Sequence, residues 1–60
     1  MPVNLLLVDD HRIVLDGLRA LLAGDARYEI KGEALNGKEA ISILELLKVD
    51  VVLLDIDMPV

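Results

Sequence analysis

The sequence predicts an α/β fold with the pattern βαβαβ, in which three parallel strands are ordered 2-1-3. Two apolar runs, Val3–Val8 and Val51–Asp55, lead into acidic residues and are typical of strands buried on both faces. Tyr28–Glu33 alternates polar and apolar residues, which indicates a strand at the edge of the sheet. Amphipathic stretches separate the three strands, and right-handed connections would place these two helices on opposite faces.

The first predicted helix runs from about Arg12 to Ala23. Gly17 lies inside it at a cost of about 1 kcal/mol relative to Ala, and we expect it to allow a close approach of the helix to the sheet. Gly24 is well placed to end the helix. The apolar stripe of this helix comprises Val14, Leu15, Leu18, Leu21 and Leu22.

The second predicted helix runs from about Gly37 to Lys48. Asn36 is a favourable N-cap residue, and Glu39 three positions later resembles a capping box. Lys48 would favour the negative end of the helix dipole. The apolar stripe of this helix comprises Ala40, Ile41, Ile43, Leu44 and Leu47.

Acidic residues stand at the ends of the two apolar strands. Asp9 and Asp10 follow the first strand, and Asp55 ends the third. Neighbouring strands lie about 4.8 Å apart, so we expect these carboxylates to converge at the switch point where open α/β sheets bind ligands. Simpler interpretations stay open: backbone N–H groups could satisfy the acids, Asp10 could be the N-cap of the first helix, and Asp57 could be a turn residue before Pro59.

Crowded carboxylates repel one another, and a hard divalent cation relieves that repulsion. Mg²⁺ prefers oxygen ligands, and a carboxylate can itself attack a phosphoryl group to give an aspartyl phosphate. Asp55, alone at the end of a buried strand, is the candidate nucleophile, while Asp9 and Asp10 are the candidate metal pair. We interpret His11, the one histidine of the chain, as a solvated loop residue rather than a metal ligand.

Composition and charge exclude several classes of protein. With 55% hydrophobic residues the chain is not disordered, and a net charge of −5 argues against a nucleic-acid-binding surface. No apolar run is long enough to span a membrane, no export signal is evident, and cysteine is absent, so we expect a cytoplasmic protein. At 60 residues we expect a fragment of a larger domain; the alternative is a small complete protein that oligomerises.

The acidic motifs resemble the receiver domain of bacterial two-component response regulators. Val8-Asp9-Asp10-His11 follows one apolar strand, and Leu53-Leu54-Asp55-Ile56-Asp57-Met58-Pro59 follows in the correct order. Gly17 to Leu22 (GLRALL) is similar to the branch whose output is a LuxR-type helix-turn-helix, and Asn36-Gly37 followed by Glu39-Ala40 also fits. The resemblance covers residues 1–60 but only the first half of a receiver domain, so it implies half of a doubly wound, flavodoxin-like fold.

The resemblance implies a role for each acid. Asp55 would be the phosphoacceptor, supplied by a histidine kinase or a small acyl phosphate in a Mg²⁺-dependent reaction. Asp10 would ligate the metal directly and Asp9 mainly through water, while Asp55 and the backbone carbonyl of Asp57 would complete the metal site. Such a module is not itself an enzyme. It normally controls a DNA-binding transcription regulator, whose output domain we expect to be absent from this segment.

The resemblance also implies parts that we expect to lie beyond Val60. The family's switch Ser or Thr and its phosphate-pairing Lys have no counterpart after Asp55, so we expect impaired phosphorylation. The third strand would have an uncovered apolar edge, and we expect a homodimer through this edge or by domain swapping.

Two other interpretations stay open. Asp55-Ile56-Asp57 resembles the D-x-D pair of haloacid-dehalogenase-type phosphatases, although that motif usually ends the first strand of its fold and Asp9-Asp10 would be unexplained. The chain could also be a purely structural, self-associating half-domain in which the acids are inherited without a task.

Overall fold

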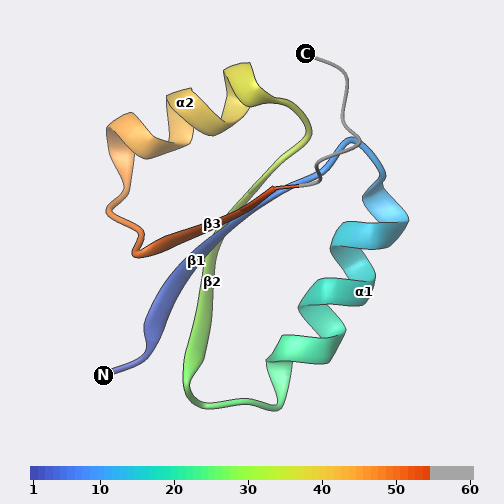
Figure 1. Cartoon of the computed structure of the whole chain (residues 1–60), viewed down its shortest axis with the longest axis vertical. Helices are drawn as coiled ribbons and strands as arrows, with labels where there is room; N and C mark the ends of the chain where they lie inside the picture. The colour runs from blue at the N-terminus through green and yellow to red at the C-terminus, as the bar shows by residue number, and fades with distance from the viewer. Residues whose placement is uncertain (55–60) are drawn as a thin grey trace.

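Residues 1–54 form a three-stranded parallel sheet with a helix on each side (Figure 1). The computed structural model describes residues 1–54. The elements follow in the order β1 (Val3–Val8), α1 (Arg12–Ala23), β2 (Tyr28–Ala34), α2 (Gly37–Leu46) and β3 (Val51–Leu54). The strands lie in the order β2-β1-β3, and both pairs are parallel. The predicted α/β class and 2-1-3 order are confirmed.

β1 is the central strand, and its residues alternate between the two layers of the core. Leu5 and Leu7 point to the α1 side, where Leu15 is also fully buried. Leu6 and Val8 point to the α2 side, so α1 and α2 cover opposite faces of the sheet, as predicted (Figure 1). The buried cluster on the α2 side comprises Leu6, Val8, Ala34 and Ala40.

β2 is an edge strand, as predicted, but a bulge interrupts its alternation. The pairing of β1 with β2 slips between Leu5 and Leu6, so Lys31 has no register partner on β1. Beyond the bulge Glu33 faces α1, where its Oε2 accepts a hydrogen bond from Arg19 Nε at 2.9 Å. The predicted regular alternation is therefore wrong after Lys31, because one extra residue exchanges the two faces of the strand.

The close approach of a helix to the sheet occurs at a different glycine from the one predicted. A Cβ atom at Gly17 would meet nothing within 4 Å, so the prediction for this residue is wrong. At Gly32 in β2, a Cβ atom would lie 3.3 Å from Ile43 Cγ2 and 3.4 Å from Leu6 Cδ1. The absent side chain of Gly32 therefore lets α2 pack closely on the sheet.

The predicted helix caps are largely confirmed. Gly24 is the C-cap of α1. Asn36 Oδ1 accepts the backbone N–H of Glu39 at 2.8 Å, and Glu39 Oε1 accepts the N–H of the residue before Asn36. However, α2 ends at Leu46 instead of Lys48, because the next residue has an extended backbone. Lys48 therefore lies beyond the last helical turn.

The apolar stripes of both helices are wider than the part that the sheet covers. On α1, Leu15 is fully buried, whereas Val14 and Leu21 are 41% and 75% exposed. On α2, Ala40 is buried and Ile41 is 61% exposed. The predicted stripes are thus confirmed only along their centres. Within residues 1–54, neither helix has the length and hydropathy that a bilayer-spanning segment needs.

Candidate functional site

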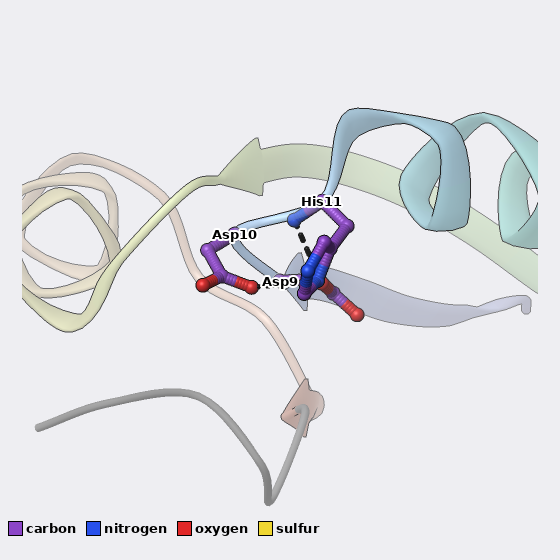
Figure 2. A group of neighbouring side chains, drawn as sticks. All are labelled: Asp9, Asp10 and His11. Atoms are coloured by element: carbon purple, nitrogen blue, oxygen red, sulfur yellow. Dashed lines mark hydrogen bonds and ion pairs between the residues drawn. The ribbon is translucent and has the colours of Figure 1, made fainter.

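Three titratable side chains gather in the loop that joins β1 to α1 (Figure 2). One potential ligand atom from each of Asp9, Asp10 and His11 lies within 4.8 Å of the other two. The loop follows the carboxyl end of β1, which is the edge where open parallel sheets bind ligands. The structure thus places both predicted acids together and adds His11 to them.

Asp9 is the buried member of the group. Among residues 1–54 it is the one polar or charged residue that is buried, with 5% of its surface exposed. Its backbone N–H donates to the carbonyl oxygen of Ala34 at 3.0 Å, which fastens the loop to the end of β2. Its Oδ1 accepts the backbone N–H of His11 at 2.9 Å. The simpler interpretation, that a backbone N–H satisfies an acid, therefore holds for one oxygen of Asp9.

Asp10 does not cap α1. The N-cap is His11, and its side chain makes no capping hydrogen bond. The interpretation of Asp10 as the N-cap is therefore wrong, because the residue directly before the first helical residue, Arg12, is His11. The Asp10 side chain is 37% exposed and faces the imidazole of His11 across the loop (Figure 2).

His11 contacts both acids. Its Nδ1 lies 2.7 Å from Asp10 Oδ1 and 3.1 Å from Asp9 Oδ1. The side chain is 64% exposed, so it is solvated as predicted, but the prediction missed these contacts. The available signal was its position directly after two acids and directly before a helix, which leaves the loop little length in which to separate them.

The donor set fits a hard divalent cation. Mg²⁺ typically takes one or two carboxylates and fills its remaining positions with water and phosphate oxygens. Asp9 and Asp10 supply two carboxylates from one short loop, and His11 Nδ1 lies close to an oxygen of each. Negative charge therefore converges at this point from two residues.

β3 ends beside this loop. Val8 pairs with Leu54 in the parallel register of β1 and β3. The next residues in the sequence are Asp9 after one strand and Asp55 after the other. The predicted roles of Asp55 and Asp57, including the turn-residue interpretation of Asp57, lie outside the described residues.

A family model, the response regulator receiver domain, matches residues 5–60 of the chain. The chain belongs to this family. The predicted resemblance is confirmed, and the receiver assignment excludes the haloacid-dehalogenase-type phosphatase as the family of this chain.

Similar proteins carry this receiver segment in larger chains. The chain is 44% identical over 56 residues to the transcriptional regulatory protein YdfI of Bacillus subtilis, which covers 93% of this chain and 26% of that protein. It is 38% identical over 58 residues to the nitrate/nitrite response regulator protein NarL of Escherichia coli K12, with 97% and 27% covered. No solved structure gives a significant match.

A third relative is named as an enzyme and not as a regulator. The protein-glutamate methylesterase/protein-glutamine glutaminase 2 of Photobacterium profundum is 40% identical over 60 residues, which is 100% of this chain and 15% of that protein. The receiver chain spans about a quarter of YdfI and NarL and less of the methylesterase. Membership of the family therefore does not by itself determine the output of the whole protein.

Proposed function

We propose that this receiver chain is the phosphoacceptor module of a two-component phosphorelay, in which Asp55 receives a phosphoryl group from a histidine kinase. One observation supports this most strongly. β1 and β3 are neighbours that end in register at Val8 and Leu54, and Asp9 and Asp10 converge in the loop directly after β1. In the sequence, Asp55 directly follows the strand that is paired with β1, and Asp9 and Asp10 directly follow β1 itself.

In the proposed reaction, a carboxylate oxygen of Asp55 attacks the phosphorus atom of the phosphohistidine donor. The bond between phosphorus and the donor's imidazole nitrogen breaks, and that nitrogen keeps the electron pair and takes up a proton from solvent. Bound Mg²⁺ would screen the repulsion between the carboxylate and the phosphoryl oxygens. We assign Asp10 as a direct metal ligand and Asp9 as one that acts mainly through water, together with Asp55 and the backbone carbonyl of Asp57.

Asp9 suits a fixed position in such a site. Its side chain is buried, and the His11 backbone N–H holds its Oδ1 at 2.9 Å. A ligand that is already immobilised loses little conformational freedom when a cation binds. Asp10, which is more exposed, can adjust to the cation.

Intact mass spectrometry after incubation with Mg²⁺ and acetyl phosphate tests the proposal. Acetyl phosphate transfers its phosphoryl group with release of acetate. We expect one phosphoryl adduct, lost in Asp55→Asn and prevented by a chelator. Asp57→Asn is the matched control and should keep the adduct, because only the backbone carbonyl of Asp57 is assigned a role. Absence of an adduct on folded wild-type chain would favour the purely structural half-domain, whereas turnover of phosphate monoesters would favour an enzyme.

We further propose that this chain is part of a receiver domain that controls transcription. Residues 1–60 would form the first part of a receiver domain, and its phosphorylation would control a DNA-binding transcription regulator in the cytoplasm. The transcriptional regulatory protein YdfI supports this output because of its name, and the GLRALL segment is similar to the LuxR-type branch. The net charge of −5 supports regulation without direct nucleic-acid contact from this segment.

We also propose that two copies of this chain associate through β3. Within residues 1–54, β3 pairs with β1 alone, and Val51, Leu53 and Leu54 are 41%, 38% and 60% exposed. An unpaired apolar edge is a template for a further strand, and a two-fold axis would make the new pair antiparallel. Sedimentation equilibrium at micromolar concentration should show a dimer that Leu53→Lys dissociates. A swapped dimer would survive that substitution, and a compact wild-type monomer would contradict association.

A further inference from the structure

The imidazole of His11 lies against both carboxylates of the candidate metal site (Figure 2). Its Nδ1 is 2.7 Å from Asp10 Oδ1 and 3.1 Å from Asp9 Oδ1. An ionised carboxylate only accepts hydrogen bonds, so these two contacts are favourable in the form of the ring that carries a hydrogen on Nδ1. The ring N–H therefore does in part what a cation does, because it brings positive charge to the point where two negative charges converge.

We propose that His11 is a positioning residue that competes with Mg²⁺ for the oxygens of Asp9 and Asp10. This inference depends on the proposed function, which assigns those two acids to the metal. Without a cation, the ring holds the two carboxylates together against their repulsion. A cation that binds Asp10 directly and Asp9 through water displaces the ring N–H, and contacts that exist only in the metal-free state lower the affinity for the metal.

The exposure of the ring favours its displacement. The His11 side chain is 64% exposed, so its displacement removes little apolar surface from the core. The Asp9 side chain, in contrast, is only 7% exposed and is held by the backbone N–H of His11. The carboxylate therefore keeps its position when the ring moves away.

Direct ligation by His11 is the alternative role, and it predicts the opposite effect. Mg²⁺ strongly prefers oxygen ligands, whereas imidazole suits zinc, copper, iron and nickel. Loss of a ligand would weaken Mg²⁺ binding, but loss of a competitor strengthens it. The sign of one substitution therefore distinguishes the two roles.

The test compares Mg²⁺ binding by wild type and His11→Ala, using calorimetry at fixed pH and ionic strength. The substitution removes the ring alone: the His11 carbonyl still accepts from Val14 and Leu15, its N–H still donates to Asp9, and no side-chain cap is lost. We expect Mg²⁺ binding about three- to tenfold tighter, as the loss of partly exposed charge-assisted contacts would give. His11→Phe, which keeps a ring without the N–H, should behave in the same way.

A second measurement uses the wild-type chain and needs no substitution. Because His11 is the one histidine, its nitrogen-15-labelled ring gives one set of imidazole signals. The Nδ1 signal should shift on addition of MgCl₂ with the midpoint found by calorimetry, as the ring loses its carboxylate partners. A ring signal that stays constant while Mg²⁺ binds would overturn the inference, and so would equal or weaker binding by His11→Ala.

Failure of the inference is distinguishable from failure of the proposed function. Equal Mg²⁺ affinities of wild type and His11→Ala would leave the metal site standing and reject only the competition. A folded wild-type chain that binds no Mg²⁺ would reject the metal site itself and the competition with it.

Discussion

Substitutions of Asp9 separate its structural role from its electrostatic one. Asp9 Oδ1 accepts the His11 backbone N–H at 2.9 Å, in a residue that is 5% exposed. Asp9→Ala removes this acceptor and should lower the free energy of unfolding by about 1–3 kcal/mol, the range for a buried donor that loses its partner. Asp9→Asn keeps an amide oxygen at the same place and removes the charge, so its loss should stay below about 1 kcal/mol.

This difference is large for a protein of this size. A 60-residue domain has a free energy of unfolding of about 3–9 kcal/mol, at roughly 0.05–0.15 kcal/mol per residue. With a urea dependence of about 1 kcal/mol per molar, typical of small domains, Asp9→Ala should move the urea midpoint down by about 1–3 M. Asp9→Asn should move it by less than about 1 M.

Urea unfolding followed by far-UV circular dichroism measures both variants, since the chain contains no Trp. Equal losses for Asp9→Ala and Asp9→Asn would refute the reasoning, because the charge would then matter and the hydrogen bond would not. Added Mg²⁺ should raise the midpoint of the wild type through binding to the folded state, and should raise it less in either variant.

Three further predictions use the same unfolding assay. Gly17→Ala should raise the free energy of unfolding by about 0.5–1 kcal/mol, because Gly17 has no positive φ and an added Cβ meets nothing within 4 Å. A decrease would contradict the open space around this Cβ. Asn36→Ala should lower it by about 1 kcal/mol through loss of the cap to Glu39, whereas Asn36→Asp should be nearly neutral, and equal losses would contradict the capping role. The side-chain hydrogen bond from Arg27 lowers the pKa of Asp25 from 3.8 to about 2. Because this folded-state pKa lies below the ordinary value, the contact stabilises the fold above about pH 4 and is lost as the pH falls toward 2. Asp25→Asn should therefore flatten the decline in stability across that window, and an unchanged decline would assign it to other groups.

The strand order was predictable because polarity differs sharply between strands. The run at Leu5–Val8 is apolar throughout, whereas β2 carries charges, so one strand had to be central and the other an edge. The caps at Asn36 and Gly24 were predictable for a related reason, since each is a short-range preference of a single residue type. Asp9 and Asp10 lie together because they are consecutive in the sequence, whereas their predicted convergence with Asp55 lies outside the described residues.

Other features depend on contacts that no local pattern records. After the bulge at Lys31, Gly32 pairs with Leu6 of β1 and lies against Ile43 of α2. Both of these partners are distant from Lys31 in the sequence. α2 ends at Leu46 although the following residues are acceptable in a helix. The contacts of His11 depend on how three side chains orient in one loop, which spacing does not determine.

The central position of β1 has a consequence for the order in which the protein can be assembled on the ribosome. β1 precedes both strands with which it pairs, and its run Leu5–Val8 is apolar and buried throughout. At about 5–20 residues per second, β2 follows β1 only after an interval on the order of seconds, whereas a helix forms in about a microsecond. α1 is thus the first partner able to shield the nascent strand, through Leu15. Substitutions that weaken α1 should consequently reduce the yield of newly made protein, by exposing β1 to aggregation, more than they reduce the stability of molecules that have already folded.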